Sequence, residues 1–344
     1  MNSDYRFQYV PEYIIRNWKD RDGSVAYVTR NDSEVYTSPV ADTFIEHMKA
    51  DIGEDALSSS DALSNTNLID MVSRIVHGDF SSLDNDVFWL SALVSHLFYS
   101  NPYGKGRIDF ITHLYADELE KVRNREEASA FITRHFNDSR STRDLLMMRE
   151  MSSIAFVYGF DLSAAVLEAP EDIDFALGMN PAFIFNPSDN SLFEGATMPL
   201  SGNGTAVILP LSLRYAVCLY DGSCYKVRKT DGRGLLSEDD VVLFNMIMAR
   251  SGISLVFSPT EKYGDEYYSH LYEIIGTDIM ETKNPSFSFI RVLARAFSLD
   301  CPEREYSQAL LRYDSKYIAG KSDDITQDEF QNRIRYALSL SASV

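Results

Sequence analysis

The sequence predicts an α+β fold with a mostly antiparallel sheet, a helical middle segment and a helical C-terminal tail. Residues 173–259 form short β-branched and aromatic runs bounded by Gly, Pro, Asn or Asp, which is typical of strands. Residues 40–166 and 263–344 instead space their apolar side chains at helical intervals. With 344 residues, of which 45% are hydrophobic and 24% charged, the chain is long enough to bury a sizeable core.

The first forty residues are extended and rich in turns. Residues 24–29 have the valine and tyrosine content of a strand. Beyond Pro39 the spacing becomes helical, and three apolar sets predict helices. These sets are Phe44, Ile45 and Met48; Leu68, Met71, Val72 and Ile75; and Phe88, Leu93 and Leu97.

Six strands are expected in the β-rich part, at residues 174–177, 182–185, 205–209, 213–220, 223–227 and 253–257. Asp221-Gly222 predicts a two-residue hairpin turn that pairs Cys218 with Tyr225. One helix interrupts the strands. Ser237 and Asp240 predict its start, because they have the spacing of a capping box.

These patterns predict two units of unequal size. Residues 1–262 form the α+β domain, with a helical insertion at about residues 40–166. Residues 263–344 form a helical extension packed on that domain.

Charge and composition limit the cellular compartments and the classes of partner that we expect. The formal net charge of −19 repels nucleic acid and anionic membranes, which argues against both as partners. No stretch approaches the roughly 20 apolar residues that cross a bilayer, and the first residues lack a secretory signal. Three cysteines are too few for a disulfide framework. We therefore expect a reduced, cytoplasmic protein with an unknown protein or small-molecule partner.

Four segments resemble a widespread bacterial family. Residues 7–18 (FQYVPEYIIRNW) resemble the opening of domain-of-unknown-function family 4238, which begins His-His-Tyr-Val-Pro-Gln and continues to Leu-Arg-Asn-Phe. Residues 175–186 are similar to its strand ending in Ser-Asp-Asn-Pro, residues 209–212 to its Pro-Leu-Ser-Pro segment, and residues 240–258 to its closing helix and strand. The resemblance implies a shared α+β scaffold over residues 5–258.

The polar residues of those motifs differ in this chain. The two family histidines correspond to Phe7 and Gln8, and the aspartate corresponds to Met179. Phenylalanine and methionine cannot transfer protons, and glutamine is a poor ligand for most metals. The resemblance therefore implies a scaffold with a changed site, and it assigns no catalytic residue, metal or cofactor.

Asn180 and Asn245 lie inside apolar runs, where an unpaired amide costs about 1 to 3 kcal/mol. One interpretation is structural: Asn180 holds the turn before Pro181, and Asn245 ties its helix to a strand. The other is functional: the two asparagines line a cleft with three further polar residues. These three are Gln8, Tyr9 and Arg214.

Three hypotheses of function follow. The first is a bacterial cytosolic protein that acts through binding, as a catalytically divergent member of its family. The second is a hydrolase or nuclease acting on nucleic acid or nucleotide, of the kind found among toxins and defence proteins. The third is an acidic protein that binds a basic partner.

Overall fold

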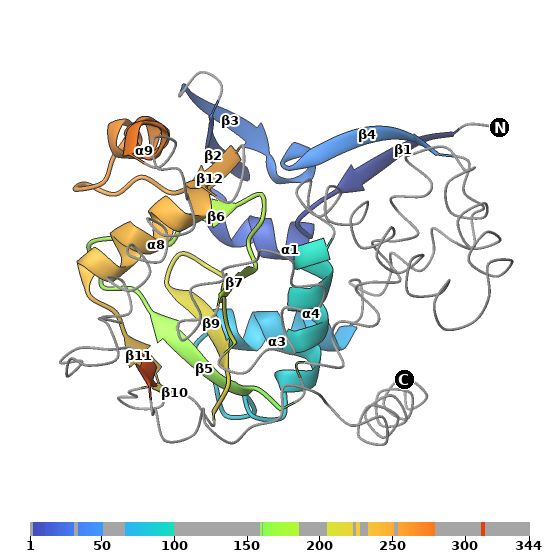
Figure 1. The fold of residues 1–344 in the computed structure, drawn as a ribbon. Coiled ribbons are helices and arrows are strands. Elements are labelled where there is room, and N and C mark those ends of the chain that lie inside the picture. Colours follow the sequence, from blue (N-terminus) through green and yellow to red (C-terminus); the bar gives the residue numbers. More distant parts are fainter. Residues whose placement is uncertain are drawn as a thin grey trace, which may run out of the picture.

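The α+β class is confirmed in the computed structural model (Figure 1), which describes residues 3–30, 34–50, 66–99, 159, 161–185, 205–222, 225–227, 233–250, 254–278 and 311–313. Two larger sheets stand at its centre, and helices cover them on both sides. Among the described residues, no helix combines the length and apolar character needed to span a membrane.

The larger sheet has five strands in the order β11-β5-β9-β8-β7. All pairs are antiparallel except the outer pair β11–β5. Its strands are β5 (Ser163–Glu168), β7 (Phe183–Phe185), β8 (Ala206–Pro210), β9 (Tyr215–Tyr220) and β11 (Arg233–Leu235).

The second sheet has four antiparallel strands in the order β3-β2-β12-β6. They are β2 (Ser24–Thr29), β3 (Val35–Pro39), β6 (Leu177–Gly178) and β12 (Ser254–Phe257). Because β6 belongs to this sheet and β7 to the larger one, residues 179–182 carry the chain from one sheet to the other.

Both faces of the larger sheet are buried, each in a different core. On β9, Val217 and Leu219 enter the first core, whereas Ala216, Cys218 and Tyr220 enter the second. β5 and β8 alternate in the same way. Since successive side chains of a strand point to opposite faces, this alternation makes the larger sheet the wall between the two cores.

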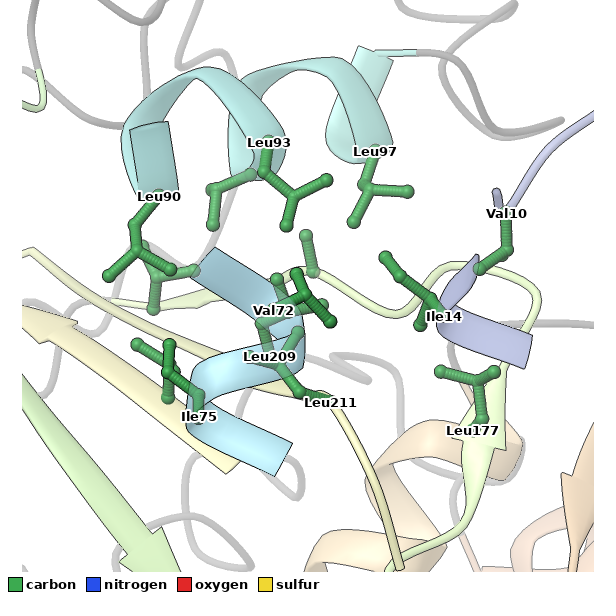
Figure 2. Close-up of a cluster of buried hydrophobic side chains, with 14 of the residues drawn as sticks. Val10, Ile14, Val72, Ile75, Leu90, Leu93, Leu97, Leu177, Leu209 and Leu211 are labelled. Atoms are coloured by element: carbon green, nitrogen blue, oxygen red, sulfur yellow. The ribbon is translucent and has the colours of Figure 1, made fainter. Parts of the chain in front are cut away.

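The first core lies under the helices at the amino end of the chain. They are α1 (Glu12–Ile15), the 3-10 helix η1 (Arg16–Trp18), α3 (Thr66–Val76) and α4 (Val87–Tyr99). Figure 2 shows leucines of α4 facing Val72 and Ile75 of α3, with Leu209 beside them. The turn intervals in the sequence correctly predicted both α3 and α4.

The second core lies under α8 (Glu238–Arg250) and α9 (Asp265–Asp278). The capping box at the start of α8 is confirmed. The Ser237 hydroxyl accepts a bond from the Asp240 amide, at 3.3 Å, and the Asp240 carboxylate accepts one from the Ser237 amide, at 2.8 Å.

Several local expectations were wrong. Residues 12–18 were expected to be extended or turn, but they form α1 and η1, and of the strand expected at residues 174–177 only Leu177 belongs to a strand, β6. Residues 45–50 were expected to be helical, but they form β4 (Ile45–Ala50), which pairs with β1 (Ser3–Gln8). Residues 163–166 belong to β5 and not to a helix. The hairpin at Asp221-Gly222 does not form, because β5 and β8 occupy both edges of β9.

β10 (Tyr225–Val227) pairs instead with β13 (Leu311–Tyr313), so part of the expected helical tail is a strand. Most of the tail and of the helical insertion, residues 100–158 and 279–344 apart from β13, lies outside the described residues. The division at residue 262 stays a prediction.

Candidate functional site

Gln8 and Tyr9 hold the turn that leads into β4. The Gln8 side-chain amide donates to the carbonyl oxygens of Val40, at 3.3 Å, and Thr43, at 3.1 Å. The Tyr9 backbone amide donates to Phe44, at 3.0 Å, and the Tyr9 ring is buried in the first core. Phe44 has a φ of 57°, which is strained for a bulky residue. These bonds hold the strained turn in place.

Asn245 lies on α8 and is fully buried. Its Oδ1 accepts a hydrogen bond from the backbone amide of Ala176, at 2.7 Å, and its Nδ2 donates to the carbonyl oxygen of Asp174, at 2.9 Å. The side chain therefore pairs like a strand neighbour with the segment that precedes β6. This is the arrangement that the structural interpretation of Asn245 predicts.

Asn180 is half-buried in the segment that crosses between the sheets, next to the buried Met179. It directly precedes Pro181, and a proline restricts the residue before it to extended conformations. That Asn180 holds a turn here stays a prediction. β6 ends at Gly178, directly ahead of this segment.

Arg214 belongs to an ion-pair network at the end of β5. Its Nη2 lies 3.3 Å from a carboxylate oxygen of Glu168, and Nη1 of Arg233 lies 2.6 Å from the other oxygen. The Glu168 side chain is 13% exposed, so the two guanidinium groups balance a carboxylate that is largely removed from water.

The hydrogen bonds and ion pairs described above for these candidates join them to separate parts of the fold. Gln8 bonds to residues 40–43, Asn245 to residues 174–176, and Arg214 to Glu168. A cleft that unites all five stays a prediction.

A concave surface does lie elsewhere, between α1–η1 and α3, with a volume of about 270 Å³. We call it the α1–α3 groove. It is lined by Tyr13, Arg16, Asn17, Lys19, Val72, Ser73, Val76 and His77. Tyr13, Val72 and Val76 are its more buried members, whereas Arg16, Lys19 and His77 are exposed.

The amino-terminal wall of the groove is anchored to two segments next to the sheets, one directly after β8 and one shortly before β6. Asn17 donates to the carbonyl oxygen of Leu211, at 2.8 Å, and the indole of Trp18 donates to that of Phe175, at 2.6 Å. Since Trp18 is only 1% exposed, η1 is fixed on the core, and the positions of Arg16 and Lys19 are fixed with it.

Sequence reasoning missed this groove. Arg16 and Asn17 stand in the segment that resembles the family opening, and the α3 residues were expected only as the helix around Leu68 and Ile75. The one local signal was the Arg-Asn pair next to a buried tryptophan. That the two segments meet depends on tertiary packing, which neither pattern contains.

Two further groups bear on chemistry. Burial lowers the pKa of His96, on α4, to about 4, so this histidine is neutral at neutral pH. In the described part of the chain, no three His, Cys, Asp or Glu side chains gather as metal ligands do. His113 and Asp117, which have one-turn spacing, lie outside it.

The fold and the groove define an α+β protein with two cores and a concave cationic surface at its amino-terminal helices. No family model matches the chain, and neither the curated proteins nor the solved structures contain a match.

Proposed function

We propose that this chain is a cytosolic bacterial binding protein, a divergent relative of domain-of-unknown-function family 4238 that has no catalytic site in the family's positions. The observation that carries the proposal is the fully buried amide of Asn245, whose oxygen and nitrogen are both hydrogen-bonded to backbone groups. An amide committed in this way is unsuited to holding a substrate or a reacting water.

Gln8 supports the same interpretation. It stands where the family has a histidine, and its side-chain nitrogen donates to two carbonyl oxygens of the turn before β4. Its amide has no titratable proton for acid–base work. At both positions a polar group stabilises the scaffold. This is what we expect of a protein that keeps a family's fold and has lost its catalytic groups.

A turnover assay tests the proposal. The purified chain is incubated with nucleotides, with single- and double-stranded nucleic acids and with peptides, with and without divalent cations. We expect no turnover above that of a heat-denatured control.

Robust turnover that Asn180→Ala abolishes, while the melting temperature stays unchanged, contradicts the proposal and supports the alternative of a hydrolase or nuclease. Asn180 is the informative position because it is half-buried and its immediate neighbours in sequence, Met179 and Pro181, are buried. If Asn180→Ala lowers both the activity and the melting temperature, Asn180→Asp separates the two causes, because it keeps the shape of the side chain and changes its chemistry. Loss of activity in Asn180→Asp at an unchanged melting temperature then also contradicts the proposal.

The net charge of −19 favours a second candidate, an acidic protein that occupies a basic partner. Association through such a charge weakens steeply as salt rises. Pull-down from a lysate of the source bacterium at low and high salt tests it. A basic protein that is retained only at low salt supports this candidate, and retention that is independent of salt contradicts it.

A further inference from the structure

The α1–α3 groove is a cationic place on an acidic protein. Its eight lining residues, all within the described ranges, include Arg16 and Lys19 and no carboxylate. Neither cation has an ion-pair partner among the described residues. With a net charge of −19, most of the surface repels anions, so a local pair of unneutralised cations is a feature that needs an explanation.

The C-terminal end of α3, whose carbonyl oxygens would repel an anion, is capped. α3 points its C-terminal end at the groove, and free carbonyl oxygens there carry partial negative charge. The backbone amide of Asp79 donates to the carbonyl oxygen of Arg74, at 2.9 Å, and that of Gly78 donates to the carbonyl oxygen of Ile75, at 3.0 Å. Gly78 has a φ of 83°. This is the pattern of a Schellman cap, which neutralises the last turn.

His77, which directly follows α3, lines the groove. Its Nδ1 lies 2.6 Å from the carbonyl oxygen of Ser73. Because a carbonyl oxygen only accepts hydrogen bonds, Nδ1 carries a proton, and Nε2 is left for another partner. Arg74, which follows Ser73 on α3, adds no free positive charge here. The Asp86 carboxylate neutralises it, with nitrogen–oxygen distances of 2.8 and 2.9 Å.

The inner wall is apolar and uncharged. Burial raises the pKa of the Tyr13 hydroxyl above its ordinary value, so this group stays neutral and does not oppose an anion. Val72 is buried and Val76 half-buried beside it. A volume of about 270 Å³ lies just below the roughly 300 to 1,000 Å³ of typical small-molecule sites, so the groove suits a small ligand.

We propose that the α1–α3 groove binds a small organic anion, whose phosphate or carboxylate lies at Arg16 and Lys19 and whose apolar part contacts Tyr13 and Val76. This inference rests on the proposed binding function and names its ligand class and place. The groove is too small to enclose a folded partner, and its cationic rim and apolar wall match the two halves of such a metabolite.

Calorimetric titration of the full chain tests the inference, with phenyl phosphate, benzoate and inorganic phosphate as probes. We expect saturable binding of at least one aromatic probe, about tenfold weaker or more in Arg16→Gln and Lys19→Gln, because each variant loses a charge-assisted contact. Arg21→Gln is the matched control, since it removes the same charge from an exposed residue that does not line the groove.

The ratio of the affinities for phenyl phosphate and inorganic phosphate measures the contribution of the apolar wall. Val76→Thr keeps the shape of the side chain, and it is expected to reduce the preference for phenyl phosphate over inorganic phosphate. A preference for phenyl phosphate over benzoate identifies phosphate as the anionic group, and the reverse identifies carboxylate.

Absence of saturable binding by every probe overturns the inference, and so does an equal loss in Arg21→Gln. Either result leaves the proposed binding function in place, because that proposal is tested by turnover. Conversely, if the chain shows turnover and Asn180→Ala abolishes it, the proposed function is wrong even if the groove binds its probes. Circular dichroism of each variant confirms that the fold is retained.

Discussion

Replacing Asn245 by alanine is the most informative change to stability that the fold offers. In the native protein this amide satisfies the backbone amide of Ala176 and the carbonyl oxygen of Asp174. Alanine removes both bonds and leaves two backbone groups at a buried site without partners. The segment before β6 also loses its connection to α8.

The magnitude follows from those two bonds. A buried donor or acceptor that loses its partner costs about 1 to 3 kcal/mol. Ala176 is fully buried, so its amide cannot turn to solvent, and Asp174 is half-buried, so its carbonyl can recover part of its loss. We therefore expect Asn245→Ala to lower the free energy of unfolding by about 2 to 5 kcal/mol.

Urea denaturation followed by circular dichroism measures this loss, and an unchanged slope confirms that the unfolded state is the same. Asn245→Asp is the matched variant. Its oxygen can still accept from Ala176, but the carboxylate repels the carbonyl oxygen of Asp174, so burial and this contact raise the pKa of the new carboxyl. A raised pKa means that the variant is most stable below about pH 4, the ordinary value, and weakens as pH rises.

A loss below about 0.5 kcal/mol for Asn245→Ala, which is the range of ordinary surface substitutions, refutes the structural role assigned to this amide. So does an Asn245→Asp variant whose deficit relative to the native chain is the same at pH 3 and pH 7. Either outcome would also remove the main support for the proposed function.

Three further predictions concern other buried groups. Tyr268 is fully buried and its hydroxyl has no hydrogen-bond partner among the described residues, so Tyr268→Phe should be neutral or raise the free energy of unfolding by about 1 kcal/mol; a clear loss in urea contradicts this. Burial raises the pKa of Asp174 more than Arg214 lowers it, so its ionisation opposes folding above the ordinary pKa. Asp174→Asn should therefore be more stable than the native chain at pH 7, and the gain should vanish below about pH 4 in melts across that range. Asp86→Asn weakens two bonds from the Arg74 guanidinium and should cost about 1 to 3 kcal/mol, whereas a melting temperature that does not change would show that this pair contributes nothing.

The sequence predicted best those elements whose signals are local. The start of α8 is set by Ser237 and Asp240, three residues apart, and β2 has its own run of β-branched and aromatic residues. Both were predicted at the right residues. Burial on two sides accounts for the apolar run around Asn180. Leu177, Met179 and Ala182 enter the first core, whereas Phe175, Ala176 and Phe183 enter the second.

Failures occurred where a distant partner decides the structure. Residues 45–50 form a strand because residues 3–8 pair with them, and Tyr220 cannot start a hairpin because Ser163 and Ala206 already flank it. The candidate cleft was drawn from polar residues inside apolar runs, but such a pattern cannot distinguish an amide that holds backbone from one that faces a ligand. The α1–α3 groove was missed because its walls meet only in the folded chain.

The pairing of β2 with β12 has a consequence for synthesis on the ribosome. Ser24 to Thr29 can pair with β3 as soon as residues 35–39 emerge, but the opposite edge of β2 waits for Ser254–Phe257. Trp18 likewise has no acceptor until Phe175 arrives. The nascent chain therefore carries an exposed strand edge until residues 254–257 emerge, and an unburied indole until Phe175 emerges. Unpaired strand edges and exposed apolar side chains of this kind are where wrong pairing with neighbouring chains begins.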